Sequence, residues 1–167
     1  LWFVYTLIGL YLLTPILRPW VKSATKVELS YFLIIWLITI LYGIPALTNY
    51  LPTNSIQNFS GYIGYFVLGY YLSKHITIHN YILVACFALG VIFTVLLTYN
   101  ASSAIRYFDG FYYNYLTFNV ILCSISVFLF FKQVELKSEI VKKGLSQISK
   151  YSFGIYLSHV LILNLLY

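Results

Sequence analysis

Long apolar stretches alternate with short polar stretches along the whole chain. A helix that crosses the hydrocarbon core of a bilayer needs about 20 mostly apolar residues, with some latitude for tilt. The stretches lack the strict alternation that marks the strands of a membrane barrel. The pattern therefore predicts an all-α, polytopic transmembrane helix bundle. About six spanning helices are expected, at residues 1–17, 29–47, 57–73, 81–99, 114–131 and 151–167.

Four prolines indicate where these helices should stop. Proline has no backbone N–H to donate, so it is tolerated at helix ends and is costly inside a helix. Pro15 lies in the last turn of the first stretch, where we expect it to end or kink the helix. Pro19, Pro45 and Pro52 fall at or just past predicted helix ends.

Composition supports a membrane protein. The chain is 61% hydrophobic and 8% charged, whereas soluble domains carry about a quarter charged residues. A surface with so little charge cannot face water, which disfavours an unusually apolar soluble globule. Methionine is absent, and the chain starts and stops within apolar stretches, so we expect an internal piece of a longer protein. Cys86 and Cys123 lie inside apolar stretches and form neither a metal motif nor a disulfide framework.

Basic residues predict the orientation. Nine of the ten Lys and Arg residues, all except Arg106, fall in three alternate loops, 18–28, 73–80 and 132–150. The positive-inside rule places such loops in the cytoplasm, so we expect a multi-pass protein of the plasma (inner) membrane. Because these residues flank membrane segments, lipid head groups explain them better than nucleic acid does.

Segment 132–150 is too polar to span a bilayer. Apolar residues recur within it at helical spacing among mixed charges, which is compatible with a cytoplasmic helix lying in the interface. A solvated connector explains the same composition, and both interpretations stay open.

The sixth stretch carries a polar stripe. Ser149, Ser152, Tyr156 and His159 follow one another at spacings of three, four and three residues, so they share one helix face. Polar side chains are costly in lipid, so we expect this stripe to face the bundle interior or a wet cavity. His159 is then either a neutral histidine bonded to a neighbouring helix or part of the lining of a site.

The loop between the fourth and fifth stretches combines aromatic rings with two opposite charges. Arg106 and Asp109 are spaced to form an ion pair, with five aromatic residues around them between positions 107 and 113. Such a group could hold a sugar, although anchoring at the membrane interface predicts the same aromatic residues. No nucleotide-binding, metal-binding or hydrolase motif accompanies it.

Three stretches, "LWFVYTLIGLYLLTPILRP", "GYIGYFVLGYYLS" and "ISKYSFGIYLSHVLIL", resemble segments of acyltransferase family 3. The family comprises bacterial integral-membrane O-acyltransferases that acetylate surface polysaccharides, and the most similar branch is that of the enterobacterial-common-antigen O-acetyltransferases. The stretch "YFDGFYYNYLTFNVILCSISVFLFF" also fits, so the resemblance covers most of residues 1–167. The order and spacing of the motifs are more specific than any one of them.

The resemblance implies one membrane acyltransferase domain of about ten helices, of which residues 1–167 lack the first few and the last. It implies transfer of an acyl group, acetyl above all, from acyl-CoA to a hydroxyl of a cell-envelope saccharide, with acetyl-CoA as donor and no bound cofactor or metal. The family's catalytic histidine and basic residue lie near its first helix, outside this chain. We therefore expect no catalytic residue here and no activity from the chain by itself.

The resemblance and the polar stripe together yield a set of candidates for lining the transfer pathway or binding substrate. These candidates are His159, Tyr156, Ser152, Trp2, Tyr11, Arg106 and Asp109. A polytopic transporter or flippase, or a membrane protein of the polysaccharide-polymerase kind, would share the helices, the orientation and the stripe. Those remain the alternative interpretations.

Overall fold

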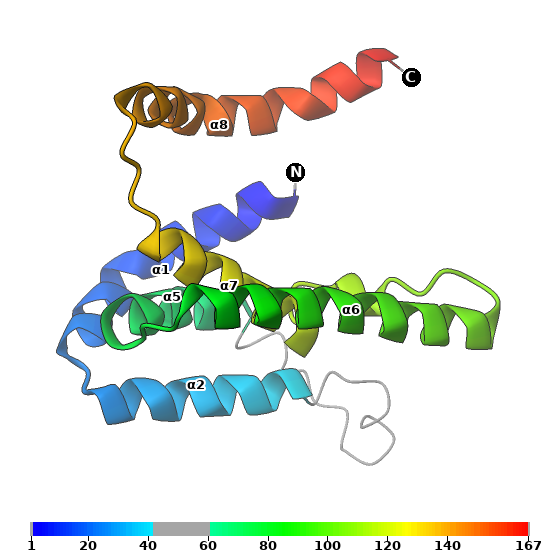
Figure 1. Ribbon diagram of the computed structural model, residues 1–167, viewed down its shortest axis with the longest axis horizontal. Helices are drawn as coiled ribbons and strands as arrows, with labels where there is room; N and C mark the ends of the chain where they lie inside the picture. Colours follow the sequence, from blue (N-terminus) through cyan, green and yellow to red (C-terminus); the bar gives the residue numbers. More distant parts are fainter. Residues whose placement is uncertain (1, 42–60, 167) are drawn as a thin grey trace. The chain divides into compact units, whose positions relative to one another are not determined.

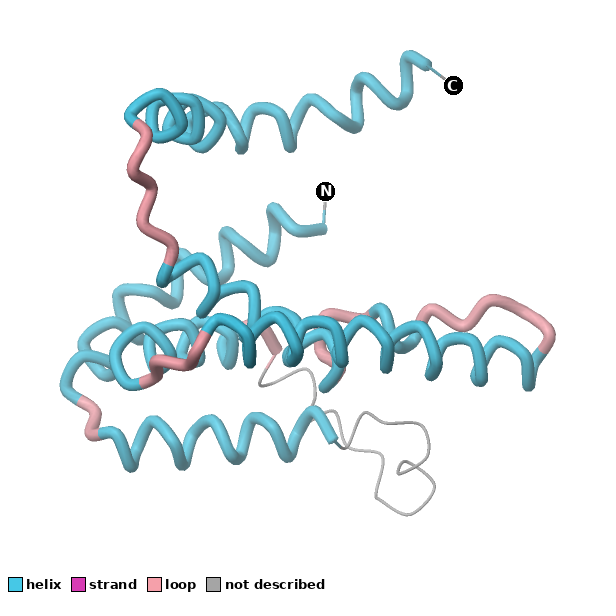
Figure 2. Tube along the Cα trace, viewed as in Figure 1, coloured by secondary structure: helices cyan, strands magenta, loops and turns pink. Residues whose placement is uncertain are grey.

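The computed structural model describes residues 2–41 and 61–166, and every long regular element in these ranges is an α-helix. No strand occurs within them (Figure 1, Figure 2). The helices are α1 (Trp2–Ser23), α2 (Lys26–Leu41), α5 (Ile63–His75), α6 (Asn80–Ile105), α7 (Phe118–Gln133) and α8 (Glu139–Leu166), with a short 3-10 helix η1 (Phe111–Tyr113) before α7. The predicted all-α class is confirmed.

The chain divides into two compact units. One comprises Thr6–Gln133, and the other comprises the first residues through Tyr5 together with the chain from Val134 onward.

Three helical stretches in the described ranges are long and apolar enough to cross a membrane: Val4–Ser23, Asn80–Ile105 and Phe111–Gln133. The predicted segments 29–47 and 57–73 lie partly outside the described residues. The described part of α2 has 16 residues, which at 1.5 Å per residue spans about 24 Å. The transmembrane helical architecture agrees with the sequence, and these three stretches define its clearest spans.

Helix α1 corrects the prediction that the first helix ends near Pro15 or Pro19, whereas a kink at Pro15 stays a prediction. It runs through both Pro15 and Pro19 and ends at Ser23. Unwinding the chain in an apolar medium would leave more unpaired backbone groups than two prolines remove, so the helix persists. At its end the Ser23 hydroxyl donates to the carbonyls of Pro19 and Trp20, at 3.0 and 3.1 Å. Pro45 and Pro52 lie outside the described residues.

The connection from α1 to α2 is shorter than the predicted loop 18–28, because only residues 24–25 lie outside the helices. Thr25 and Glu28 form a capping box. The N–H and hydroxyl of Thr25 donate to Glu28 Oε2 at 2.6 and 2.9 Å, and the Glu28 N–H donates to the Thr25 hydroxyl at 3.3 Å.

These hydrogen bonds favour the charged form of Glu28 and hold its pKa below the ordinary value. Their contribution to stability is complete above the carboxyl's unfolded-state pKa. It is lost as the pH falls through the lower folded-state pKa.

The main core of Thr6–Gln133 lies where α1, α2, α5 and α7 meet. Its buried apolar residues are Val21, Leu29, Leu33, Trp36, Ile40, Val67 and Ile121. The largest of them, Trp36, is 1% exposed and its indole lies against the backbone of Gly64. Its Nε1–H donates to the Gly61 carbonyl at 3.1 Å, and its ring meets Tyr65 edge-on at 5.2 Å between centroids. This contact fixes α2 against α5.

Helices α6 and α7 form the most extensive pair in the unit and lie side by side (Figure 1). Gly90 of α6 permits their close approach. A Cβ atom at this position would lie 2.5 Å from Cys123 Sγ and 3.2 Å from the Asn119 carbonyl oxygen of α7. Small residues at helix interfaces let backbones come together in this way in membranes.

Replacing Gly90 with alanine should therefore lower the stability of the protein in detergent. The extra methyl group overlaps Cys123 and presses on a backbone carbonyl, which costs about 1–3 kcal/mol and outweighs the alanine helix propensity of about 1 kcal/mol. The measurement is the thermal unfolding midpoint of Gly90→Ala, Cys123→Ala and the double variant. The double variant should be more stable than the sum of the two single changes allows. Strict additivity would contradict the contact.

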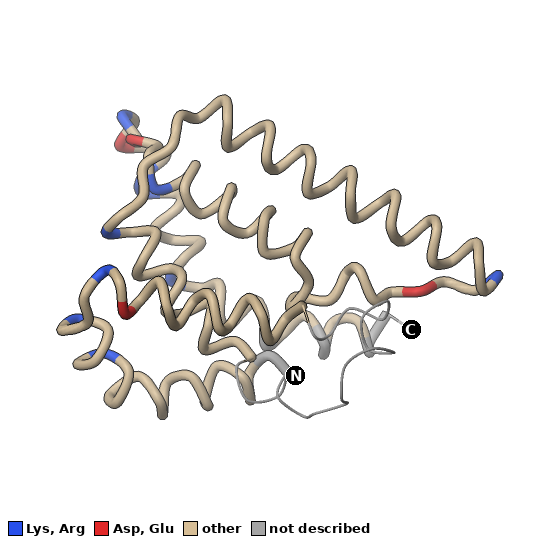
Figure 3. Tube along the Cα trace, turned by 90° about the horizontal axis from the view of Figure 1, so that it is seen from below, with Lys and Arg blue, Asp and Glu red and all other residues tan. Residues whose placement is uncertain are grey.

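One end of this unit is basic. We call it the basic end: α1, α5 and α7 stop here, and α2 and α6 start here. Figure 3 shows basic positions gathered at this end, and a single basic and a single acidic position where α6 joins α7. The Lys132 ammonium group donates to the carbonyls of Leu72 and Ile76 at 3.0 Å each, and the Gln133 amide donates to Ile78 at 2.9 Å. A cation at the last carbonyls of α5 also complements the helix dipole.

In the other unit, α8 runs without interruption from Glu139 to Leu166. Residues 134–138 contain no helix. The polar residues 139–150 therefore belong to the same helix as the predicted sixth segment 151–167, whose last residue lies outside the described ranges. Within its first turn Lys142 and Glu139 form an ion pair at 2.7 Å.

Candidate functional site

The polar stripe predicted in the sixth segment lies on one continuous helix, α8. The Ser152 hydroxyl donates to the Ser149 carbonyl at 2.8 Å. His159 Nδ1 contacts the Tyr156 carbonyl oxygen, and the two rings lie 5.1 Å apart between centroids. Ser152 and His159 are exposed within their unit, and Tyr156 is half-buried. Whether the stripe faces the bundle interior stays a prediction.

The two candidates on α1 fall in different units. Trp2 is the first residue of the helix, and the prediction for its side chain lies outside what the structure describes. Tyr11 belongs to the Thr6–Gln133 unit and its side chain is exposed. The roles suggested for both residues stay predictions.

Arg106 and Asp109 lie where α6 ends, and they do not form the ion pair that their spacing permits. The one ion pair within residues 2–41 and 61–166 is Lys142–Glu139. Arg106 instead ends α6 in the left-handed region, with φ of 53°. The Asp109 carboxylate accepts the Phe111 N–H at 2.9 Å, and the Asp109 N–H donates to the Ser102 hydroxyl at 3.0 Å. Asp109 therefore shapes the loop that leads into η1.

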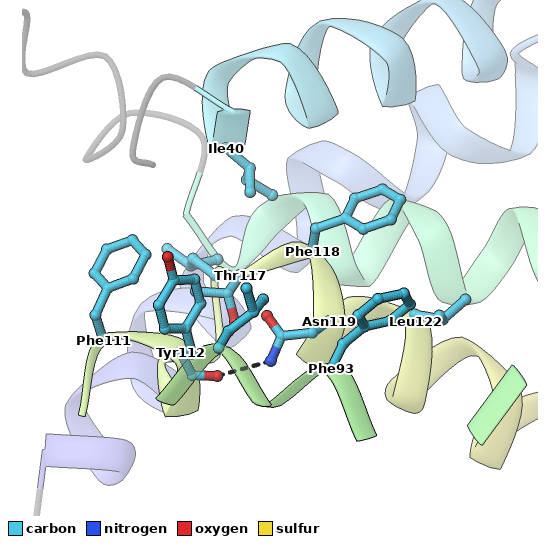
Figure 4. Close-up of a pocket in the computed structure, with 10 residues that line it drawn as sticks. Ile40, Phe93, Phe111, Tyr112, Thr117, Phe118, Asn119 and Leu122 are labelled. Carbon is cyan, nitrogen blue, oxygen red and sulfur yellow. Dashed lines mark hydrogen bonds between the residues drawn. The ribbon is translucent and has the colours of Figure 1, made fainter. Parts of the chain in front are cut away.

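A cavity of about 290 Å³ opens beside this loop, at the opposite end of the unit from the basic end. It is lined from α2 by Ile40, from α6 by Phe93 and Leu97, and otherwise by η1, α7 and the residues between them (Figure 4). Nearly all of the lining is aromatic or aliphatic. The cavity lies wholly within Thr6–Gln133.

The main polar group of the cavity wall is the amide of Asn119, in the first turn of α7. This residue is 6% exposed. Its Nδ2 donates to Thr94 Oγ1 at 2.7 Å and to the Tyr112 carbonyl at 2.8 Å, and Figure 4 shows the second of these bonds. The amide thus joins α7 to α6 and to η1, and it holds the aromatic loop over the cavity.

Sequence reasoning missed Asn119 and Thr94. Each stands as one polar residue in an apolar stretch, and a lone amide or hydroxyl in a membrane helix is common enough to pass unnoticed. The signal was present, because an asparagine in the first turn of a spanning helix needs a hydrogen-bond partner in lipid. Its partner on another helix is 25 residues away, which the sequence does not reveal.

The geometry favours binding over proton transfer at this cavity. An amide neither gains nor loses a proton near neutral pH, and Tyr112 is the one titratable side chain among the lining residues. No cluster of three or more His, Cys, Asp or Glu residues that could hold a metal ion occurs in the described part of the chain.

A family model described as an acyltransferase domain, that of acyltransferase family 3, matches residues 1–167. The match covers the full length of the sequence, so the chain belongs to this family. With its long apolar helices it is a membrane acyltransferase, as the motifs predict. No curated protein and no solved structure matches the chain.

Proposed function

We propose that the protein is an O-acyltransferase that transfers an acetyl group from acetyl-CoA to a hydroxyl of a cell-envelope saccharide. The observation that carries the proposal is the acyltransferase-domain match over residues 1–167. In the reaction the hydroxyl oxygen attacks the thioester carbonyl, the C–O bond forms and the C–S bond breaks. A base takes the hydroxyl proton and the departing thiolate of CoA is protonated. We assign the base to none of His75, His79 and His159.

The proposal places the protein in the inner membrane with the basic end in the cytoplasm, where acetyl-CoA is made. Arg18, Lys22, Lys26 and Lys74 lie near this end, and their charge is complementary to the phosphates of CoA and of lipid head groups. Donor and acceptor then approach from opposite sides, so a polar pathway has to cross the apolar helices. The α8 stripe is our candidate for part of its lining.

The direct test is acetyl transfer by the full-length protein in membrane vesicles. Isotopically labelled acetyl-CoA is supplied on the cytoplasmic side, and the ester label on the saccharide fraction is released by mild alkali. We expect alkali-labile label that is absent from vesicles of a deletion strain. A protein that carries saccharide across the membrane without acylating it would instead be a transporter or flippase.

The orientation can be tested by single-cysteine labelling in a background free of Cys86 and Cys123. An impermeant thiol reagent applied to intact cells should modify Asn54→Cys and Ser103→Cys, because both lie on predicted outer loops. Ser23→Cys and Ser138→Cys should be protected until the cells are opened. Position 54 lies outside the described residues, whereas Ser23, Ser103 and Ser138 are exposed in the structure. The reverse labelling pattern would invert the topology.

A further inference from the structure

The first turns of α8 sort their side chains onto two opposite faces. Successive residues of an α-helix are about 100° apart around its axis, so the face of each position follows from the sequence. One face holds apolar or aromatic side chains and a glycine, namely Ile140, Val141, Gly144, Leu145, Ile148 and Tyr151. The other face holds every charged residue of 139–151 together with Ser146, Gln147 and Ser149. We call residues 139–151 the amphipathic segment, and the first of these two faces its apolar face.

The apolar face has no cover within its own unit. Ile140 is 85% exposed and Ile148 is 62% exposed, and the other apolar residues of the face are exposed as well. Leaving such a face in water costs free energy in proportion to its apolar area, and an isolated helix this short is marginal in water. The segment therefore needs an apolar surface against which this face can be buried.

The membrane supplies such a surface, because the segment begins beside it. Helix α7 belongs to a stretch long and apolar enough to span a bilayer, and it ends at Gln133, at the basic end. Residues 134–138 join it to α8, and at roughly 3.5 Å per residue they reach about 20 Å at most. Figure 1 shows the first turns of α8 nearly end-on and its last turns from the side, so the axis of the helix changes direction along its length. The amphipathic segment can thus lie along the membrane surface while the later turns take another course.

The face opposite the apolar one adds positive charge. Of its three lysines, Lys142 forms the ion pair with Glu139 at 2.7 Å, whereas Lys143 and Lys150 have no ion-pair partner among residues 2–41 and 61–166. The Lys150 ammonium group lies 5.5 Å from the centroid of the Tyr151 ring. Lysine and tyrosine side chains are typical anchors of helices at a membrane interface. The two lysines outside the ion pair are complementary to the phosphates of anionic phospholipids.

We propose that the amphipathic segment binds the surface of a bilayer that contains anionic phospholipid. Its apolar face lies among the first carbons of the acyl chains, about 5–10 Å into the boundary that such helices occupy. Lys143 and Lys150 lie among the head-group phosphates. The segment is then an interfacial helix rather than the solvated connector that its composition also allows. The proposal requires neither acetyl transfer nor a particular orientation of the protein, so its test is independent of both.

Gly144 and Ser146 offer a matched pair of positions for the test. Gly144 lies in the middle of the apolar face, with nothing within 4 Å of a Cβ there, and Ser146 lies on the opposite face. Neither change removes an apolar side chain or a charge. Gly144→Cys and Ser146→Cys are made in the cysteine-free full-length protein, labelled with a fluorophore and reconstituted into vesicles of phosphatidylcholine and phosphatidylglycerol.

Two quenchers then locate each fluorophore. A lipid with a spin label near the glycerol end of its acyl chain should quench the fluorophore at position 144, and iodide in the water should quench the one at position 146. Iodide quenching at both positions would indicate a solvated connector. Quenching of position 144 by neither agent would indicate that the face packs on protein. Either result would overturn the proposal.

The role of the two lysines is tested by the rate at which an uncharged, water-soluble thiol reagent modifies unlabelled Gly144→Cys, relative to Ser146→Cys. Replacing Lys143 and Lys150 with glutamine should raise this relative rate by about fivefold for each lysine, the fold-change that one charge supplies at an anionic surface. In vesicles of phosphatidylcholine alone the replacement should leave the rate unchanged. If the rate is also unchanged in the anionic vesicles, the segment does not bind anionic phospholipid and the proposal is wrong.

Discussion

Alanine in place of Gly64 should destabilise the protein more than any other single-methyl change in the Thr6–Gln133 unit. A Cβ at this position would lie 2.0 Å from Cε2 and 2.1 Å from Nε1 of Trp36, far inside van der Waals contact. The indole cannot move aside easily, because it is 1% exposed and its Nε1 is bonded to the Gly61 carbonyl. Overpacking of this kind together with a lost buried hydrogen bond costs about 3 kcal/mol or more.

For a protein of this size, such a loss lowers the unfolding midpoint by roughly 10 °C. The measurement is thermal unfolding of the purified protein in detergent. Gly69→Ala on the same helix is the matched control, because nothing lies within 4 Å of a Cβ there. It should leave the midpoint unchanged or raise it slightly through helix propensity. A second check is Trp36→Leu, which should relieve part of the Gly64→Ala cost in the double variant. Equal midpoints for Gly64→Ala and Gly69→Ala would refute the assigned contact.

The two glycines illustrate what sequence and structure each contribute. Gly64 and Gly69 both lie in the stretch "GYIGYFVLGYYLS" that resembles the family, and the sequence alone does not distinguish them. In the structure the Trp36 indole occupies the space that a side chain at position 64 would need, which explains the glycine there. Nothing lies within 4 Å of a Cβ at Gly69, so the structure does not explain that glycine. The contact joins residues 28 positions apart on separate helices, and no local pattern encodes which tryptophan meets which glycine.

Helices were the predictable part of the fold, because a long apolar stretch can satisfy its backbone in lipid only by coiling. Helix ends were less predictable. Proline rules derived mainly from soluble proteins would end the first helix near Pro15, whereas α1 continues to Ser23. The polar composition of 132–150 likewise suggested a separate segment, although residues 139–150 continue directly into the sixth predicted segment as α8.

The candidate site was predictable only in part. The sequence identified the aromatic loop after α6 and its two charges. The ion pair that the spacing of Arg106 and Asp109 permits does not form, and the Asp109 carboxylate accepts the Phe111 N–H instead. The cavity behind the loop depends on Asn119, whose partners come from α6 and η1. Such a junction arises from tertiary packing, and each of its residues is unremarkable in its own stretch.

Removing the imidazole of His159 should lower acetyl transfer by the full-length protein about tenfold, the loss expected for one hydrogen bond in an apolar setting. In α8 its ring lies over Tyr156 and its Nδ1 contacts the Tyr156 carbonyl. That leaves Nε2 available for a partner outside its own helix. We predict that the stripe faces the bundle interior and that Nε2 bonds a polar group or a water molecule in the pathway, because an imidazole facing lipid would be costly.

The comparison of His159→Ala with His159→Gln decides between two roles. Glutamine keeps hydrogen-bonding capacity but does not titrate near neutral pH, so it should restore much of the activity if His159 lines the pathway. It should restore none if His159 transfers a proton. Ser158→Ala is the matched control on the neighbouring face of α8, where the hydroxyl donates to the Ile155 carbonyl of its own helix, and it should leave transfer unchanged. Membrane abundance and the unfolding midpoint are measured for every variant, so that a loss of transfer is not mistaken for a loss of protein. If His159→Ala alters neither transfer nor stability, the prediction that the stripe faces the bundle interior is wrong, because burying a polar group without a hydrogen-bond partner costs free energy.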